Sequence, residues 1–554
     1  MEMECHPIST VPGTSALFRD YTEPAASTHA ADLRRWYPTD PFTMQWAHAA
    51  PTLDAAHLAR LTDALLRQTD RYDAPGAVLA NIERLKNGAA AVVTGQQVGL
   101  FGGPLFTLLK AATAIRKAQD ATKLSGREHV PIFWLASEDH DLEEVDQVSL
   151  LSKSAVEKLT LGLDGSKPLP VGSLILGDRT DEGRHRLEAE LERACDLLHW
   201  APICDLLREC YAPGATFAGA FGRLLTKVFA AYGLIVMDAA TADFHSLGAP
   251  TLRAAIEHAD ELEAALLVRT QELESAGYHA QVLITPGHSL LFLIDADTGA
   301  RQPLRRTAPA AGSPDAGWKA GAKLYTTADL LAILDAEPER LSPNALLRPV
   351  FQDTILPTAA YIGGPAEVAY FAQSAVAYQQ ILGRITPLLP RLSATLVEPA
   401  VAATLAAQEV SFPQILEAKT IEALALRLGA RAMPIEAKRK IAAAGNAMDT
   451  ELTALTEYMA AMSADLGRAA TVSANKMRYQ MDRLRRMSAD FELQKQASLT
   501  KQATAIMLNL LPEGHLQERV LGGIWFLARH GDALPALLVD HAGQECPGHR
   551  VIFL

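Results

Sequence analysis

Five short apolar segments, separated by helical stretches, most restrict how this chain can fold. They cover residues 90–95, 130–136, 233–239, 357–362 and 385–389, and a turn follows each one. Helical patterns lie between them, at 104–122, 249–275 and 365–382. Short continuous apolar runs are typical of parallel strands buried on both faces. Their alternation with helices predicts an α/β fold with a doubly wound parallel sheet.

Glycine, amide and charged residues follow the carboxyl end of each predicted strand. In doubly wound sheets, ligands bind in the crevice beyond these ends. We therefore expect one ligand-binding rim to which all five strands contribute. Its candidate residues are Gln96 and Gln97 after the first strand, Glu138, Asp139, His140 and Asp141 after the second, Asp238, Thr241, Asp243 and His245 after the third, Tyr361, Gly363, Gly364, Glu367 and Tyr370 around the fourth, and Arg391 after the last.

The turn after the first strand, TGQQVGLFGGP at 94–104, is rich in glycine. Glycine lets the backbone approach a ligand closely and adopt positive φ. The helix that follows offers unpaired N–H groups and a positive dipole end. We interpret the turn as a phosphate or carboxylate site; the alternative is a tight turn without a ligand. It has neither G-x-G-x-x-G nor the Lys-Ser/Thr of a P-loop. Its glycines are Gly95, Gly99, Gly102 and Gly103.

Four adjacent titratable residues, Glu138 to Asp141, follow the second strand. Carboxylates bind hard cations, and histidine transfers protons near neutral pH. Adjacent residues in a strand alternate faces, so the four cannot all point one way. We interpret the cluster as a site for binding a substrate amine or hydroxyl and for proton transfer. A metal site and a helix N-cap with solvated charges are the alternatives.

Three further charged residues are candidates for the same rim. Arg348, in the segment LSPNALLRPVFQD with Asn344, clamps a carboxylate or phosphate, or forms a structural ion pair instead. Glu367 lies near a helix start, where a carboxylate is favourable in any case; we interpret it as a partner for a sugar hydroxyl or an amine. Lys110 either reaches a bound anion or is a solvated helix lysine.

Composition excludes several classes of protein. The 554 residues carry a net charge of −13, which argues against a protein that coats nucleic acid or an acidic membrane. We expect no membrane span and no secretory signal, because no run of 18 apolar residues occurs and the N-terminus lacks a basic and an apolar region. The five cysteines are an odd number without C-x-x-C, which fits a reducing cytoplasm. We interpret Cys195, Cys204 and Cys210 as buried thiols rather than zinc ligands.

The chain divides into three parts. Residues 1–395 form the predicted α/β core, interrupted by inserts at about 151–230 and 280–345 that we place over the active site. Residues 396–510 are helical, and a tail at 511–554, with a possible strand at 536–540, packs back on the core. From 435 to 510 Gly and Pro are scarce, and apolar residues recur at heptad-like spacing, which predicts a long helix or an antiparallel coiled-coil arm. The apolar positions are Leu452, Leu455, Met459, Met462, Leu466, Ala469, Met477, Met481, Leu484, Phe491 and Leu499.

Four blocks of sequence carry a family resemblance. They are TGQQVGLFGGPLFTLLKA, VPIFWLASEDHDLEEVDQV, SPNALLRPVFQDTILPTAAYIGGPAEVAYF and LPEGHLQER (511–519). Together they resemble the BshC family, the cysteine ligases of bacillithiol biosynthesis. The similarity runs in order through most of the chain and is weaker in 151–230, 290–340 and the arm.

The resemblance implies a ligase that joins the carboxyl group of L-cysteine to the amine of glucosaminyl-malate. It also implies a Rossmann-like core with two connective inserts, a homodimer formed through the coiled coil, and ATP or another nucleotide as cofactor. From the residues themselves we expect no metal, membrane or nucleic-acid partner. The chain departs from the related synthetases because it lacks His-x-Gly-His after the first strand and Lys-Met-Ser-Lys-Ser.

An amide forms from a free carboxylate only after activation, and the developing charge needs oriented donors. We assign these donors to the turn at 95–103, with Gln96 and Gln97, and to Arg348. His140 or Asp139 accepts the proton of the amine, Glu367 holds the sugar, and Arg391 and Lys110 contact the nucleotide. Three alternatives are an RNA-linked nucleotidyltransferase or synthetase-like enzyme, a scaffold without activity, and a metal-dependent hydrolase. The first would use the basic residues Lys476, Arg478, Arg483, Arg485 and Arg486 of the arm; a solvated helix face is their other interpretation.

Overall fold

The computed structural model describes residues 3–177, 181–307 and 317–554. All five segments predicted as strands form one parallel sheet in the order β13-β12-β2-β3-β6. The strands are β2 (Ala90–Gln97), β3 (His129–Ala136), β6 (Ile235–Asp238), β12 (Thr358–Gly363) and β13 (Leu388–Pro390). The prediction of a doubly wound α/β core is therefore confirmed, and the carboxyl ends of the strands share one edge.

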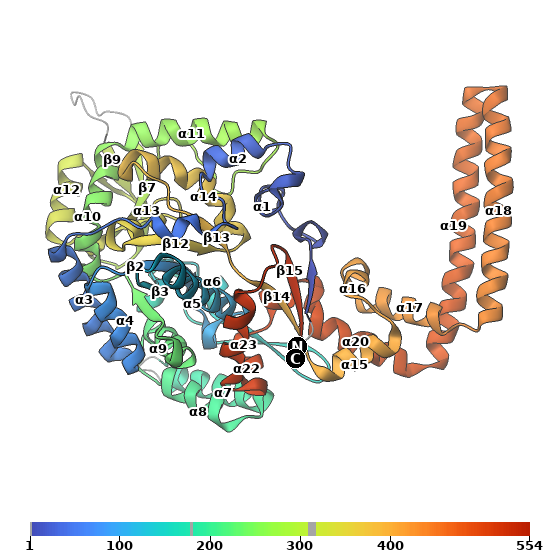
Figure 1. Cartoon of the computed structure of the whole chain (residues 1–554), viewed down its shortest axis with the longest axis horizontal. Helices are drawn as coiled ribbons and strands as arrows, with labels where there is room; N and C mark the ends of the chain where they lie inside the picture. Colours follow the sequence, from blue (N-terminus) through green and yellow to red (C-terminus); the bar gives the residue numbers. More distant parts are fainter. Residues whose placement is uncertain (1–2, 178–180, 308–316) are drawn as a thin grey trace.

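Helices cover both faces of this sheet (Figure 1). The core helices are α3 (Ala55–Thr69), α4 (Gly76–Lys86), α5 (Phe106–Ser125), α9 (Phe217–Val228), α10 (Ala242–Glu257), α11 (Ala259–Ser275), α13 (Arg348–Ile355) and α14 (Pro365–Ala377). The stretch predicted as one helix at 249–275 is thus divided between α10 and α11. Two N-terminal helices, α1 (Ala16–Thr22) and α2 (Ala30–Trp36), pack beside α14 and α11.

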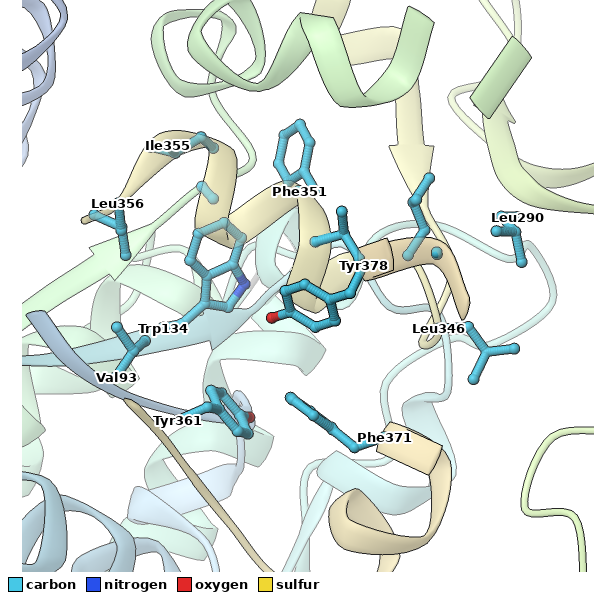
Figure 2. Close-up of a cluster of buried hydrophobic side chains, with 14 of the residues drawn as sticks. Val93, Trp134, Leu290, Leu346, Phe351, Ile355, Leu356, Tyr361, Phe371 and Tyr378 are labelled. Atoms are coloured by element: carbon cyan, nitrogen blue, oxygen red, sulfur yellow. The ribbon is translucent and has the colours of Figure 1, made fainter. Parts of the chain in front are cut away.

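Aromatic side chains fill the space between the sheet and helices α13 and α14. Trp134 of β3 and Tyr361 of β12 face Phe351 and Phe371, and all four are buried (Figure 2). A Cβ at Gly248 of α10 would lie 2.1 Å from the Phe351 ring, so only glycine permits this close approach. Each such aromatic side chain contributes about 1.5–3 kcal/mol by burial. The core therefore fixes Tyr361 and the start of α14 at the edge of the sheet.

The first insert contains a two-stranded hairpin and helices. These are β4 (Gln147–Leu151), β5 (Val156–Thr160), α7 (Asp181–Leu198) and α8 (Ala201–Cys210), preceded by the short α6 (Leu142–Val145). Cys204 and Cys210 are buried free thiols and Cys195 is a half-buried one. Tyr211, which follows α8, reaches back to the glycine-rich turn, so this insert supports the turn from behind.

The second insert is a five-stranded antiparallel sheet in the order β10-β9-β8-β7-β11. Its elements are β7 (His288–Ile294), β8 (Arg301–Thr307), β9 (Gly317–Ala320), β10 (Lys323–Tyr325), α12 (Thr327–Ala336) and β11 (Leu341–Pro343). Because β11 leads directly into the segment of Asn344 and Arg348, the insert borders the strand ends of the core.

The two ends of the chain meet in a third sheet of order β1-β15-β14. Its strands are β1 (Met3–His6), β14 (Ser393–Val397) and β15 (His549–Phe553). A disulfide joins Cys5 of β1 to Cys546, which differs from the expectation of reduced cysteines throughout the chain. The strand expected at 536–540 is wrong: that segment lies in α23 (Ala533–Ala542), because Leu534 and Leu538 are buried one helical turn apart.

A helical arm projects from the core (Figure 1). Its elements are α15 (Pro399–Gln408), α16 (Phe412–Ala418), α17 (Ile421–Ala432), α18 (Ile435–Met462), α19 (Ala464–Lys495) and α20 (Ala497–Leu510). Helices α18 and α19 form the antiparallel pair that was one of the two predicted forms. The tail then returns to the core through α21 (Gln517–Val520), α22 (Gly523–His530) and α23.

The seam between α18 and α19 uses only some of the large apolar residues that the heptad spacing selects: Leu452 is buried, and Met459, Leu466 and Met481 are half-buried. A Cβ at Gly467 would lie 2.7 Å from Ala460, and one at Gly445 would lie 2.4 Å from Arg485, so small residues bring the helices together. Other large side chains of the pair are exposed to solvent. The exposed ones include Leu455, Tyr458, Met462, Met477, Leu484, Met487 and Phe491.

Candidate active site

A cavity of about 560 Å³ opens at the carboxyl ends of β2, β3 and β12. Side chains of the second insert and of the C-terminal tail complete its wall. The structure therefore brings together residues from 95 to 519 at one place. Of the residues nominated from sequence, the cavity is lined by Gly95, Gln96, Gln97, Lys110, Glu138, Asp139, His140, Asn344, Arg348, Tyr361, Gly364, Glu367, Tyr370 and Arg391.

The later glycines of the first turn lie outside this cavity. Gly99 and Gly103 line a smaller adjoining cavity of about 340 Å³, which shares Gln96 and Gln97 with the first. Gly102 lines neither of these two cavities: its N–H donates to the Tyr211 hydroxyl at 3.0 Å, and a Cβ there would meet Leu224 at 3.0 Å. Gly102 and Gly103 have φ of 87° and 67°, so the turn requires glycine at both positions.

Gln97 and Asp139 connect the ends of the two central strands. The Gln97 amide donates to the Asp139 carboxylate at 2.6 Å, and the His140 backbone N–H donates to the same carboxylate at 2.8 Å. Parallel pairing of β2 with β3 places Gln97 opposite Ala136 and so carries both side chains to the same edge. These two hydrogen bonds fix the orientation of the Asp139 carboxylate in the cavity wall.

Arg301 of β8, which sequence reasoning missed, lies against this pair. Its guanidinium donates to His140 Nδ1 at 3.3 Å and to the Pro343 carbonyl at 3.0 Å, and it stacks 3.7 Å from the Phe292 ring centroid. Arginine only donates, so Nδ1 accepts and the neutral imidazole carries its proton on Nε2. Residues 301, 303, 304 and 305 all line the cavity, and no pattern in the sequence of this strand selects Arg301.

Glu138 is held from below by His245 of α10, a residue that the sequence nominates for the rim without a partner. The His245 ring is fully buried, with Nε2 2.9 Å from the Glu138 carboxylate and Nδ1 3.1 Å from the Pro338 carbonyl. Burial alone lowers the pKa of His245, but the adjacent Glu138 carboxylate outweighs burial and raises the pKa above its ordinary value of 6.5. The sequence places His245 after the third strand but gives no indication of its partner.

Lys110 and Glu367 form a buried ion pair at the floor of the cavity. The Lys110 ammonium is 2.8 Å from Glu367 and also donates to the Gly95 carbonyl at 2.7 Å and the Gln96 side chain at 2.8 Å. The other Glu367 oxygen accepts the Gly364 N–H at 2.5 Å, which caps α14. Burial raises the pKa of Glu367, but Lys110 outweighs burial and the net change is a decrease. Lys110 therefore neither reaches a bound anion nor lies in solvent, as the two interpretations from sequence had it. Its ammonium binds Glu367 and the end of β2.

Two tyrosines connect this pair to Arg348. The Tyr361 hydroxyl donates to Glu367 at 2.8 Å, and the Arg348 guanidinium donates to the hydroxyls of Tyr361 at 3.2 Å and Tyr370 at 2.8 Å. Among the described residues, no carboxylate forms an ion pair with Arg348. Its positive charge therefore faces the cavity without a neutralising partner, whereas a structural ion pair was the alternative from sequence.

The C-terminal tail contributes to the site. Arg391 pairs with Glu518 at 2.7 Å, and both side chains are buried. Burial raises the pKa of Glu518, but Arg391 outweighs it and the net pKa is lower. The next residue, Arg519, is exposed and lines both the main and the adjoining cavity. The LPEGHLQER segment contains Glu518 and Arg519, but nothing in the sequence alone connects this segment with the strand ends.

Two other nominated residues have local structural roles or lie away from the cavity. Asp141 is the N-cap of α6, where its carboxylate accepts the Glu144 N–H at 3.3 Å, and it does not line the main cavity. The expectation that Asp141 binds substrate is therefore not supported by its position. Gly363 lies below the rim, where a Cβ would meet Leu388 at 3.0 Å. Only Gly364 of that pair reaches the main cavity.

Two features are absent from the described residues. No group of three or more His, Cys, Asp or Glu side chains in the described part of the chain is arranged to hold a metal ion. No helix within the described ranges is both long and apolar enough to cross a membrane.

The wall of the cavity carries both signs of charge. Glu138, Asp139 and Glu144 lie near the end of β3, and burial together with Asp141 and Asp139 raises the pKa of Glu144. The cationic side chains are Lys110, Arg301, Arg305, Arg348, Arg391 and Arg519. Such a wall has room for a ligand with carboxylate groups at one end and an amine at the other.

Comparison with known proteins gives matches along the whole chain. Residues 1–392 match the family model described as the N-terminal Rossmann-like domain of bacillithiol biosynthesis BshC. Residues 394–554 match the model of the C-terminal coiled-coil domain of the same family.

Three relatives carry the name "Putative cysteine ligase BshC". A protein of Koribacter versatilis is 41% identical over 552 residues, which is 99% of both chains. A protein of Solibacter usitatus is 34% identical and covers 100% of both chains. A protein of Salinibacter ruber is 32% identical over 93% of both chains.

Proposed function

Because the chain belongs to the BshC family of bacillithiol biosynthesis, we propose that it is a ligase that joins the carboxyl group of L-cysteine to the amine of glucosaminyl-malate. The observation that carries this proposal is the single cavity in which Asp139, bonded to Gln97, lies with the unpaired Arg348. An amide-forming enzyme needs both a proton acceptor for the amine and cations for carboxylates. The name that the relatives share indicates cysteine as a substrate, and the cavity contains the proton acceptor and the cations.

The charges suggest where each substrate part lies. The malate carboxylates lie against Arg348 and Arg301, whose guanidinium groups match carboxylates bidentately. The amine lies against Glu138 and Asp139. Both oxygens of Glu367 already accept hydrogen bonds from Lys110, Tyr361 and Gly364, so Glu367 holds the floor of the cavity rather than the sugar.

Proton transfer falls to Asp139 rather than His140. Since Arg301 donates to His140 Nδ1, the Nε2 atom of the neutral ring bears the proton and donates a hydrogen bond. His140 therefore orients an oxygen of the substrate. Asp139 accepts hydrogen bonds from Gln97 and from the His140 backbone, and its remaining lone pairs accept the amine proton.

We propose the adjoining cavity as the place of the nucleotide, ATP or another. The cavity lies at the start of α5, where Thr107 has a buried hydroxyl without a hydrogen-bond partner among the described residues, and Arg519 lies on its wall. A helix start and an arginine favour phosphate groups. When bound, the nucleotide would activate the cysteine carboxylate. Arg519 and the glycine turn would hold its phosphates, while Arg391, paired with Glu518, would stay structural.

The proposal includes a homodimer formed through the arm. Met477, Leu484 and Phe491 of α19 are exposed at intervals of seven residues, and each is more than half exposed. A heptad stripe of this kind is typical of a coiled-coil seam, so a second copy of the chain is the occupant we propose. Arg478 pairs with Asp449 and Arg485 with Asp482, which favours a protein partner over RNA for this arm.

The reaction itself tests the proposal. Purified protein is incubated with L-cysteine, glucosaminyl-malate and ATP, and mass spectrometry measures bacillithiol. Omitting each component in turn identifies which ones the enzyme requires. We expect product only when both substrates and a nucleotide are present; a complete mixture that gives no product from folded protein would refute the proposed ligase. We place this activity in the cytoplasm.

A further inference from the structure

A second large cavity, of about 780 Å³, lies behind the candidate active site. Helix α5, the segment 389–393 and the segment 542–550 supply most of its wall. Among the described residues, Arg391 is the one side chain that lines both this cavity and the main one. The proposed ligase reaction assigns no role to the second cavity.

Arg550 of β15 lines this cavity with a buried guanidinium that has no acidic partner. It is 5% exposed, and it donates to the carbonyls of His541, Gln544 and Cys546. Its Nε has no hydrogen-bond partner in the described part of the chain. Burial lowers the pKa of Arg550 to about 10. A buried charge without a counter-charge is unfavourable, so this arrangement calls for an anion.

Lys117 of α5 adds a second cation to the wall. It forms no ion pair with a described residue, and burial lowers its pKa, as does the positive charge of Arg550. The acidic side chain nearest in sequence, Asp120, accepts two hydrogen bonds from Arg116, at 2.9 and 3.1 Å. Glu518 is likewise occupied by Arg391. Two carboxylates, Asp120 and Glu545, also line the cavity, but its wall carries four cationic side chains, Lys117, Lys123, Arg391 and Arg550, so positive charge is in excess.

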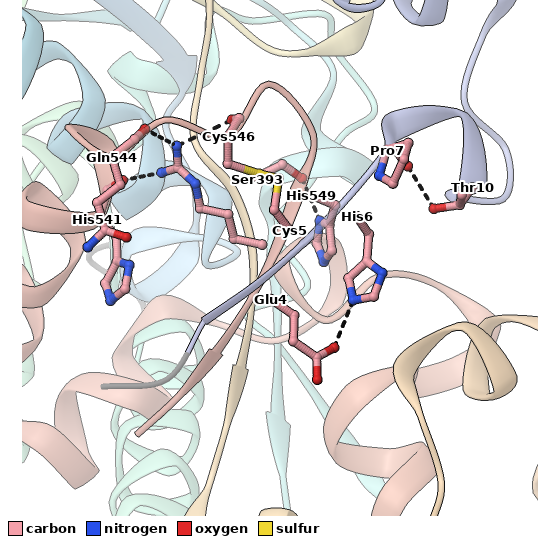
Figure 3. The surroundings of a disulfide bond; sticks show 11 residues. Glu4, Cys5, His6, Pro7, Thr10, Ser393, His541, Gln544, Cys546 and His549 are labelled. Carbon is pink, nitrogen blue, oxygen red and sulfur yellow. Dashed lines mark hydrogen bonds and ion pairs between the residues drawn. A yellow bond between two sulfur atoms is a disulfide. The ribbon is translucent and has the colours of Figure 1, made fainter.

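The framework around Arg550 is held in place before any ligand binds. The carbonyls of Gln544 and Cys546 that accept from it belong to one short segment, which the disulfide from Cys546 to Cys5 ties to β1 (Figure 3). A preorganised site loses less conformational entropy when it binds a ligand. Apolar side chains also line the cavity, among them Phe42, Met44 and Leu389.

We propose that this cavity binds an anionic small molecule, with its phosphate or carboxylate group against Lys117 and Arg550 and an apolar part against Phe42 and Met44. The cavity is larger than a single oxyanion requires and has the size of ordinary small-molecule sites. Lys123, exposed at the same cavity, adds to the positive potential that attracts such a molecule.

Phenyl phosphate and benzoate test this site, because they carry the same ring with different oxyanions. Each is titrated calorimetrically into the full-length protein at constant ionic strength in a buffer without phosphate. We expect at least one to bind, and we expect Lys117→Gln to raise its Kd by about tenfold, the value of a lost charged hydrogen bond. The tighter of the two probes identifies the oxyanion that the site prefers.

Two control variants locate the binding. Lys319→Gln removes an exposed lysine of β9 outside the cavity, and Arg348→Lys alters the main cavity; both should leave the Kd unchanged. Arg550→Gln should weaken binding as Lys117→Gln does. If Arg550→Gln does not fold, the Kd of Lys117→Gln alone decides the test. The proposal is overturned if neither probe binds, or if binding is the same in Lys117→Gln as in the unaltered protein.

Discussion

The Lys110 ammonium lies 2.8 Å from the Glu367 carboxylate, although 257 positions separate the two residues. Lys110 is buried, the Glu367 side chain is 13% exposed, and Lys110 also holds the Gly95 carbonyl at the end of β2. The pair thus fastens the first strand-to-helix turn to the start of α14. Its position at the floor of the cavity makes it the structural link between the two glycine-containing turns.

Breaking this ion pair should destabilise the protein strongly. Glu367→Gln leaves the Lys110 charge buried without its partner, which costs about 3–5 kcal/mol in comparable cases. Chemical denaturation of the variant and of the unaltered protein measures the difference in the free energy of unfolding. The exposed pair Glu436–Lys440, 3.0 Å apart, is the matched control, and Glu436→Gln should change stability by less than about 1 kcal/mol. Equal effects at the two pairs would show that burial does not matter here.

His245 should make stability depend on pH. The pKa of His245 is raised in the folded protein, so the folded protein binds this proton more tightly than the unfolded chain does. The stabilisation is fully present below the unfolded pKa of about 6.5 and is lost as pH rises through the higher folded pKa. Each tenfold difference in proton affinity contributes about 1.4 kcal/mol.

Unfolding of the unaltered protein and of His245→Asn between pH 5.5 and 9 measures this contribution. We expect the difference in stability between the two to be largest at the acidic end and to shrink toward pH 9. His279→Asn, at an exposed histidine, should show no such trend. A difference that stays constant across the range would mean that Glu138 does not hold His245 in its protonated form.

Arg301 should control catalysis by fixing the imidazole of His140. Arg301→Met removes the donor to Nδ1 and frees the ring to exchange its tautomer, so kcat should fall by about 10–100-fold. Arg301→Lys restores charge without the planar fork and should recover only part of the rate. The pH profile of kcat should shift in Arg301→Met as well. An unchanged rate and profile would remove Arg301 from the site.

The exposed stripe on α19 should hold the proposed homodimer together. Leu484→Glu with Phe491→Glu places charges on this stripe and should convert a dimer into a monomer, as measured by light scattering after size-exclusion chromatography. Val268→Glu, at an exposed apolar residue of α11, is the control and should leave the mass unchanged. If the unaltered protein is a monomer at micromolar concentration, the dimer proposal fails.

The sequence predicts the architecture well because it depends on local patterns. Apolar runs such as 130–136 report buried strands, and the residues after them fall at the edge of the sheet by the geometry of parallel pairing. The arm was predicted for the same reason, since its spacing is regular over many turns. The strand expected at 536–540 failed because a short apolar run fits a buried helix equally well.

The partners of the site residues were not predictable from such patterns. Three contacts of the site join elements that are far apart in the chain: His245 with Glu138, Arg301 with His140, and Glu518 with Arg391. A single sequence holds no information on which distant side chains meet, because any buried carboxylate accepts any suitable donor. The same limit explains why the glycine turn appeared to be one site: Gly99 and Gly103 face the adjoining cavity, and Tyr211 fixes Gly102 from behind.

The most direct measurement compares Asp139→Asn with Asp141→Asn in the formation of bacillithiol from L-cysteine, glucosaminyl-malate and ATP. The two aspartates are two positions apart, but only Asp139 lines the main cavity, while Asp141 caps α6. We predict that Asp139→Asn lowers kcat by at least about 100-fold, and that Asp141→Asn stays within about threefold of the unaltered enzyme, in line with the loss of an exposed cap. Equal rates in both variants would contradict the assignment of Asp139 and of this cavity as the place of reaction.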